Sequence, residues 1–157
     1  MASSTPHTIM LSDDPPFVRD ESRADSVAIT PGDLIEPTGS GLVKLHATQA
    51  GNAQPWFAVE NPWSQDNTIA SIDTDYGTQD NVFYVKCHAP QQVYAWLQPG
   101  GSVAAHTLLE SAGSMGALQT ATAEGTTTVP LRYVAKALET VDNGAGTINA
   151  RIKVEVL

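Results

Sequence analysis

Ser114 is the residue of this sequence that most resembles a catalytic nucleophile. It lies in the stretch AGSMG, and a hydrolase serine commonly stands between glycines on a sharp turn. That turn needs a glycine two residues before the serine, where Ala112 stands. His106 and Asp73 complete a triad on paper, as some histidine and aspartate do in most chains. We therefore interpret Ser114 as a serine in a β-turn and expect no catalysis from it.

The glycine-rich stretch LQPGGSVAAHTLL, residues 97–109, raises the question of a phosphate-binding loop. Such a loop ends in Gly-Lys-Ser/Thr before a helix, and no lysine follows Gly101. The sequence also lacks the GxGxxG pattern of dinucleotide-binding folds. We therefore expect no nucleotide and no other cofactor.

Cysteine and histidine are too few and too scattered to predict a metal site. Cys87 is the single cysteine, so the chain forms neither an internal disulfide nor a thiolate cluster. Its neighbour His88 would point to the opposite face of a strand, where the two residues cannot act together. No ligand spacing on one element relates the four histidines, which are His7, His46, His88 and His106. We expect Cys87 to be a small buried residue.

The acidic stretch DTDYGTQD, residues 73–80, begins like a calcium-binding loop. Asp73 and Asp75 lie two residues apart, and Gly77 follows them. The glycine comes one residue early, however, and no glutamate stands at the closing position. We interpret the stretch as a polar turn that leads into a strand, and we expect no metal.

The tryptophans leave open a surface that stacks on sugars. Trp63, in ENPWSQ, lies in an expected loop and is the candidate for an exposed aromatic platform. Trp96 shares a strand face with Tyr94, and we expect that face to pack inward or into a subunit contact. A core or interface position is the favoured interpretation for the tryptophans in general.

The composition describes a single acidic, folded domain. The chain of 157 residues, 41% of them hydrophobic and 16% charged, is long enough to bury its own core. Its net charge of -9 argues against direct binding to nucleic acid or to anionic lipid, because both need a basic face. No apolar run reaches the length of about 18 residues that a transmembrane helix needs, and the N-terminal sequence does not resemble a signal peptide. We expect a protein that is used without secretion through a membrane.

Alternating apolar residues predict a mainly β fold. The last ten residues, INARIKVEVL, have an apolar side chain at every second position, namely Ile148, Ala150, Ile152, Val154 and Val156. The turn-forming residues 142–146 and the segment 131–141 complete a predicted C-terminal β-hairpin. Part of that segment, YVAKALETV, also fits a helical face, and we favour a strand because its hairpin partner is clear.

Further short strands are expected between clusters of turn residues. Their predicted positions are 26–30, 42–47, 56–60, 81–87 and 92–97, with a short helix within 103–111. A spacing of roughly ten residues between turns is typical of a barrel or a sandwich.

A weak internal repeat explains the glycine-rich stretch. The sequence from Ile29 and the sequence from Leu97 share an apolar residue, a polar residue and Pro-Gly, followed by an apolar segment and a Ser/Gly turn. Proline presets φ for the first corner position, and glycine accepts a positive φ at the second. We interpret Pro31-Gly32 and Pro99-Gly100 as the same corner used twice.

Residues 1–25 differ from the rest of the chain. They are polar, they contain Pro6, Pro15 and Pro16, and their few apolar groups cannot build a core. We expect an extended, mobile N-terminal arm ahead of a single β-rich domain over residues 26–157.

Residues 73–118 resemble part of the capsid decoration, or head-cement, proteins of tailed bacteriophages. Those sequences often contain Tyr-x-x-Gly-Asp-x-Val, a strand, a turn and then Ala-x-Leu-x-x-Gly-x-x-Val. The matching residues are Tyr76, Asp80, Val82, Ala95, Leu97, Gly100 and Val103. Gln79 stands where the family pattern usually has glycine. The likeness extends over residues 26–157.

The resemblance implies a small β-barrel or β-tulip domain without catalysis, which binds the outer surface of a phage head as a homotrimer. The partner is then the major capsid protein, the location is the virion, and the role is stabilisation of the shell. An extended arm can add a strand to an exposed sheet edge while its apolar residues fill pockets. We nominate Ile9, Leu11, Phe17 and Val18 as capsid contacts, and we expect deletion of residues 1–20 to abolish capsid binding and leave the fold intact. The alternative is a carbohydrate- or receptor-binding β module on the virion surface, which Trp63 would serve.

Overall fold

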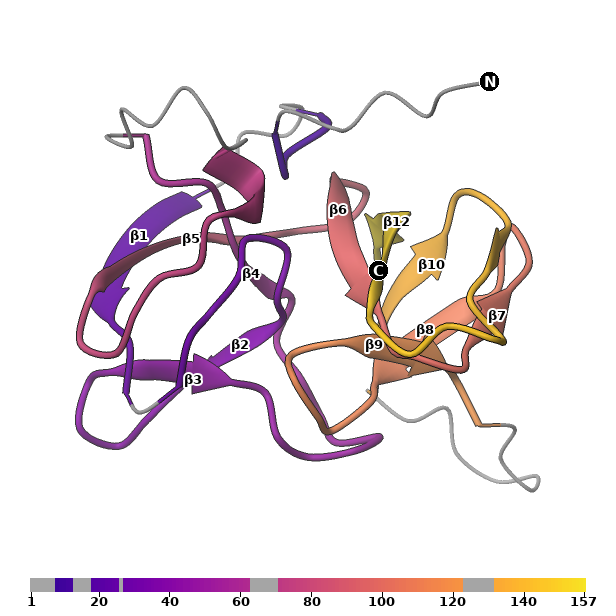
Figure 1. The fold of residues 1–157 in the computed structure, drawn as a ribbon. Helices are drawn as coiled ribbons and strands as arrows, with labels where there is room; N and C mark the ends of the chain where they lie inside the picture. Colours follow the sequence, from indigo (N-terminus) through magenta and orange to yellow (C-terminus); the bar gives the residue numbers. More distant parts are fainter. Residues whose placement is uncertain (1–7, 13–17, 26, 63–70, 123–131) are drawn as a thin grey trace.

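The computed structural model describes residues 8–12, 18–25, 27–62, 71–122 and 132–157, and nearly all of its regular structure is β (Figure 1). The strands of these residues are β1 (Val18–Arg23), β2 (Ile35–Pro37), β3 (Val43–Leu45), β4 (Trp56–Ala58), β5 (Asn81–Lys86), β6 (Gln92–Leu97), β7 (Ser102–Val103), β8 (Leu108–Ser111), β9 (Leu118–Thr120), β10 (Tyr133–Ala137), β11 (Val141–Asp142) and β12 (Ala150–Val156). A single 3-10 turn, η1 (Ser71–Asp73), accompanies them in the described part of the chain. None of the described helical structure is long and apolar enough to cross a membrane.

The second half of the chain forms a closed barrel in the order β10-β12-β6-β9-β8 (Figure 1). Its pairings are antiparallel except for β6 and β9, which meet in parallel at Leu97 opposite Leu118. Every second residue of β6 and β12 points into the barrel and is buried, as a period of two requires. The mainly β class with a small barrel is therefore confirmed.

The first half of the chain forms a second lobe beside the barrel (Figure 1). It contains the sheet β1-β5-β4 and the hairpin β2-β3. A small core of its own lies around Ile29, Ile35 and Tyr84. Phe57 and Val85, which are also fully buried, belong instead to the barrel core. The two lobes therefore share hydrophobic packing.

Five sequence-based expectations of strands agree with the structure. β3, β4, β5 and β6 lie within the predicted segments, and β10 pairs with β12 as the predicted hairpin does. The buried face of β12 begins at Ile152, whereas Ile148 is 76% exposed. The apolar alternation therefore extends further along the sequence than the core does.

Two expected elements are wrong. The predicted helix within 103–111 is instead β7, a turn with His106 at φ 68°, and β8. β8 pairs with both β9 and β10 to close the barrel, so tertiary pairing overrides a weak local helix preference. In the predicted strand 26–30, the described residues form only the bridge between Ile29 and Tyr76.

The repeated Pro-Gly corner is present at both sites. Gly32 has φ 97° and Gly100 has φ 76°, which is the left-handed region that glycine enters without strain. Both corners follow an apolar segment and redirect the chain toward the next strand. The glycine-rich stretch that resembles a phosphate loop is therefore a structural corner.

The described N-terminal residues lie against the domain, which differs from the predicted separate arm. Residues 9–11 run antiparallel to the first half of β6, with a bridge between Met10 and Val93. The Tyr94 N–H donates to the Ile9 carbonyl at 2.8 Å, and the Leu11 N–H donates to the Gln92 carbonyl at 2.9 Å. Since β9 meets β6 only at its end, the first half of β6 would otherwise be an open edge, and this segment covers it.

β1 is likewise a strand of the fold. It pairs with β5 over its full length, from Val18 opposite Lys86 to Arg23 opposite Asn81. Deletion of residues 1–20 would remove half of β1 and a buried isoleucine, so it does not test capsid contacts alone.

Candidate functional site

The nominated capsid contacts occupy different environments. Ile9 is fully buried in the barrel core, so it is not available to another protein in this structure. Leu11 is half-buried beside β6, whereas Val18, at the start of β1, is 50% exposed. Phe17 lies outside the described residues. Val18 is therefore the nominated residue that the structure places on the surface.

The nominated sugar platform, Trp63, also lies outside the described residues. Trp56, on β4, is stacked with Tyr84 at 5.6 Å between ring centroids, and the Lys86 ammonium lies 4.8 Å from its ring. Trp96 lies on the outer face of the barrel together with Tyr94, not inside it. The ring contacts that hold these two tryptophans make them parts of the scaffold.

Arg151 joins the barrel to the first Pro-Gly corner. Its guanidinium lies 4.0 Å from the Trp96 ring and donates to the Pro31 carbonyl at 3.0 Å. It also donates to the Ile72 carbonyl and pairs with Asp73 at 3.0 Å. The Trp96 Nε1–H donates to the same Pro31 carbonyl at 3.0 Å. This joint accounts for Trp96, which we expected in the core or in a subunit contact.

A buried histidine and serine form an arrangement like that of a hydrolase. The Nδ1 of His46 lies 2.7 Å from the Ser111 Oγ, and its Nε2 lies 3.5 Å from a Glu36 carboxylate oxygen. Ser111 is fully buried, however, and its Oγ accepts a hydrogen bond from the Gly113 N–H. A nucleophile must reach substrate, so we interpret these residues as a structural link between the segment after β3 and the end of β8. Burial lowers the pKa of His46, and the charge of Glu36 partly opposes this.

Ser114 and Cys87 are the remaining chemical candidates from the sequence. Ser114 is in the turn that contains Met115 at φ 53° and Gly116 at φ 61°, as the β-turn interpretation predicts. Cys87 is buried, and burial raises the pKa of its thiol to about 12, so it stays protonated. No group of three or more His, Cys, Asp or Glu side chains within the described ranges is placed to hold a metal ion.

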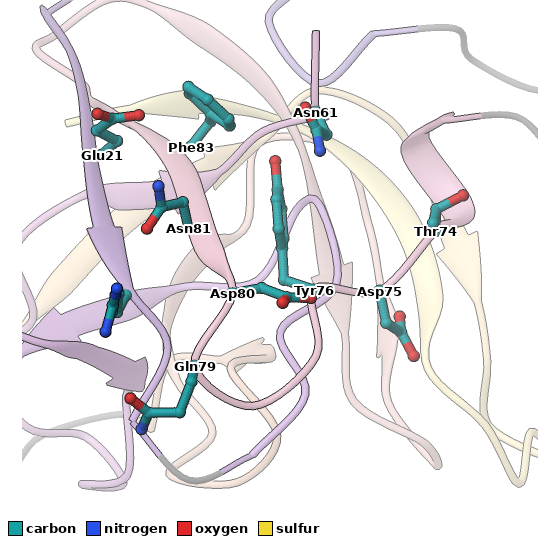
Figure 2. Close-up of a pocket in the computed structure, with 10 residues that line it drawn as sticks. Glu21, Asn61, Thr74, Asp75, Tyr76, Gln79, Asp80, Asn81 and Phe83 are labelled. Carbon is teal, nitrogen blue, oxygen red and sulfur yellow. The ribbon is translucent and has the colours of Figure 1, made fainter. Parts of the chain in front are cut away.

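A recess that we call the polar cleft lies between β1, β5 and residues 74–80 (Figure 2). Its volume is about 750 Å³. Three carboxylates, three amides, one guanidinium, one threonine and two aromatic rings line it, namely Glu21, Arg23, Asn61, Thr74, Asp75, Tyr76, Gln79, Asp80, Asn81 and Phe83. Tyr76 is fixed because its hydroxyl donates to the Val59 carbonyl at 2.7 Å. Burial raises the pKa of this hydroxyl above its ordinary value.

A second recess, which we call the apolar cleft, lies at the joint between the lobes and has a volume of about 560 Å³. Two strongly exposed side chains belong to its lining, Met115 at 62% and Ile148 at 76%. Leu45, Trp96 and Pro99 add further apolar surface. Because soluble proteins seldom leave several large apolar side chains exposed together, this cleft is a candidate contact surface.

Asp33 lies in the lining of the apolar cleft and is only 4% exposed. The pKa of its carboxyl is raised to about 7, mainly by burial and to a smaller extent by the negative charge of Asp75. The Thr30 N–H, which donates to it at 2.7 Å, and the charge of Arg151 act in the opposite direction. The cleft therefore contains a carboxyl group that titrates near neutral pH.

Sequence reasoning missed both clefts. Met115 and Ile148 are separated by residues 116–147, which include strands of the barrel, so the closed barrel is what brings them together. The sequence does contain a partial signal for the polar cleft. Asp75, Tyr76 and Asp80 all line it, and all three belong to the stretch that we weighed as a calcium loop.

Comparisons with known proteins place few limits on this chain. No protein-family model matches it, and no curated protein matches it. Among solved structures, it is similar to the N base of the head fiber gp8.5 of bacteriophage phi29. The TM-score is 0.49 at 14% sequence identity, and the match covers 90% of this chain and 94% of that chain.

Proposed function

We propose that this chain is a capsid decoration, or cement, protein of a tailed bacteriophage. In this role it binds the outer surface of the head as a homotrimer, contacts the major capsid protein and stabilises the shell without catalysis. The resemblance of residues 73–118 to such proteins motivates the proposal. The observation that carries it is the exposed apolar surface of the apolar cleft.

The apolar cleft suits contact between copies of this chain. Each copy has a net charge of -9, so like charges oppose association over most of the surface. A local apolar contact overcomes this repulsion, because burying a Met or Ile side chain contributes about 1.5–3 kcal/mol. Met115 and Ile148 are exposed enough to supply such a contact from two separate turns.

A trimer is an effective way to strengthen a shell. Three linked copies hold several capsid subunits at once, and linked contacts bind more tightly than separate weak ones. We propose that Leu11, Phe17 and Val18 take part in these contacts. Val18 belongs to β1, which is an edge strand of its sheet among the described strands, and an edge strand can accept a strand from a partner. The net charge of -9 also supports a role without direct binding to nucleic acid or membrane.

The first test measures the mass of the purified chain in solution by size exclusion with multi-angle light scattering. We expect three times 16.6 kDa. Met115→Asp and Ile148→Asp should each lower the mass toward that of a single chain. Leu157→Asp is the matched control, since Leu157 is 49% exposed and does not line the apolar cleft.

The second test adds the chain to undecorated heads of its own phage and measures cosedimentation and the temperature at which the heads release DNA. We expect saturable binding and a higher release temperature. A chain that neither binds these heads nor raises this temperature would refute the proposed function, whatever its mass in solution.

A further inference from the structure

We propose that the polar cleft is a binding site for a neutral oligosaccharide. This inference does not depend on the proposed contact between copies, because the two clefts share only Asp75 among their lining residues. It also does not rest on the expected platform at Trp63, which lies outside the described residues.

Strand register creates one wall of the site. In the pairing of β1 with β5, Glu21 lies opposite Phe83 and Arg23 lies opposite Asn81. Residues two apart on a strand share a face, so these four side chains form a compact array on the same side of the sheet. Figure 2 shows Glu21, Phe83 and Asn81 on one side of Tyr76, with Thr74 and Asp75 on the other.

Phe83 gives this wall an aromatic surface. Its side chain is half-buried and packs against both hydrophobic cores, which fixes the ring in place. The part that lines the cleft offers an apolar surface beside polar groups. A pyranose ring has the same mixed character, with C–H faces that pack on aromatic rings and hydroxyl groups at its edge.

The polar groups of the cleft are of two kinds. Asp80 and Gln79 are held in place, because Asp80 accepts from the Gly77 N–H at 2.8 Å and Gln79 donates to the Asp25 carbonyl at 3.0 Å. By contrast, the side chains of Glu21, Arg23 and Asn81 make no hydrogen bond or ion pair with the described residues. These three groups supply carboxylate acceptors, guanidinium donors and an amide that does both. Sugar hydroxyls need this combination, because each donates and accepts.

Charge restricts the class of sugar. The lining contains three carboxylates, Glu21, Asp75 and Asp80, against the single cation Arg23. A phosphorylated, sialylated or uronic saccharide would meet net repulsion. The cleft volume of about 750 Å³ is in the range of small-molecule sites and suits a short oligosaccharide.

The test is an NMR titration of the full-length, 15N-labelled chain. Maltotriose and chitotriose are the neutral probes, 3′-sialyllactose is the anionic probe, and a lysine-rich peptide is the cationic probe. We expect at least one neutral probe to shift the amide signals of residues 21–23 and 74–83 in a saturable way, and 3′-sialyllactose to leave them unchanged.

Two variants test the assignment to these side chains. Asn81→Ala and Glu21→Ala remove exposed groups, and each should weaken binding of the neutral probe about tenfold. Asn52→Ala is the matched control, since Asn52 is also exposed and lies outside the cleft, and it should bind as the unchanged chain does. Circular dichroism and thermal unfolding check that each variant is folded.

Three results would overturn the inference. The first is no saturable shift with either neutral probe, and the second is a shift centred on other residues. The third is a response to the lysine-rich peptide without a response to sugar, which would assign the cleft to a cationic partner. The binding of phage heads is measured separately, so a failure here leaves the proposed capsid function untouched.

Discussion

Replacing Ile9 with alanine tests whether the N-terminal segment is part of the fold. The side chain is fully buried in the barrel core beside β6. Truncation of a buried isoleucine to alanine removes its apolar contacts and leaves a cavity, which together cost about 2–5 kcal/mol. For a chain of this size, about 3 kcal/mol corresponds to a fall in Tm of about 6–12 °C.

The loss of stability caused by Ile9→Ala has an upper limit that the structure defines. If truncation weakens the segment enough, residues 8–12 detach while the barrel stays folded, and the loss then equals the free energy with which the segment docks. Removal of residues 1–12 should therefore destabilise the protein at least as much as Ile9→Ala. It also removes the two backbone hydrogen bonds to Gln92 and Tyr94.

The assay is urea unfolding followed by tryptophan fluorescence, with the free energy of unfolding taken from the midpoint and slope. Val18→Ala is the control, because this side chain is 50% exposed and its loss should change stability by less than about 0.5 kcal/mol. If Ile9→Ala changes stability as little as Val18→Ala does, the segment does not dock on β6. The N-terminal segment would then be a mobile arm in the free protein.

Three further substitutions test the joint between the lobes. The pKa of Asp33 is raised in the folded state to about 7, so its contribution to stability is complete below the unfolded pKa near 3.8 and is lost as the pH rises to about 7. Asp33→Asn should therefore gain stability relative to the unchanged chain between pH 4 and pH 8, by up to about 4 kcal/mol, and parallel unfolding curves at each pH measure the difference. Gly32→Ala should lower the free energy of unfolding by more than about 1 kcal/mol, because φ is +97° and the new Cβ would lie 3.0 Å from the Tyr94 carbonyl. Gly39→Ala is the control, since its new Cβ meets no atom within 4 Å, and it should be nearly neutral in the same assay. Arg151→Ala should cost about 2–3 kcal/mol through lost hydrogen bonds to buried carbonyl groups and should change Trp96 fluorescence, and an unchanged spectrum would contradict the contact.

The sequence predicted the strands that have a strong period of two. β12 and β6 alternate between buried and exposed residues, and local pattern was enough to find them. The Pro-Gly corners were also predictable, because a positive φ at Gly32 and Gly100 follows from residue type alone.

The predictions that failed, for β8 and for the N-terminal segment, concern elements that depend on long-range contacts. β8 is a strand because it pairs with β9 and β10, which are distant in sequence from the residues that favoured a helix. Ile9 is buried because β9 diverges from β6 and leaves an edge to cover, and no local pattern encodes that divergence. Both depend on how the barrel closes. The same holds for the candidate site, where the lining of each cleft comes from three or more separate segments.

The two clefts are neighbours, and this bears on how the proposed functions combine. Asp75 lines both, and its carboxylate accepts a hydrogen bond from the Thr30 hydroxyl at 2.7 Å. The other lining residues differ, so a trimer formed through Met115 and Ile148 need not cover Glu21, Arg23 or Asn81. Such a trimer would carry three copies of the polar cleft. Weak binding of a sugar by one copy would then become avid binding to a surface that repeats the sugar, since linked sites gain from effective concentration. The apolar cleft and the polar cleft can thus act together on one protein, and Met115→Asp should weaken attachment to a glycan-coated surface while leaving the affinity for free oligosaccharide unchanged.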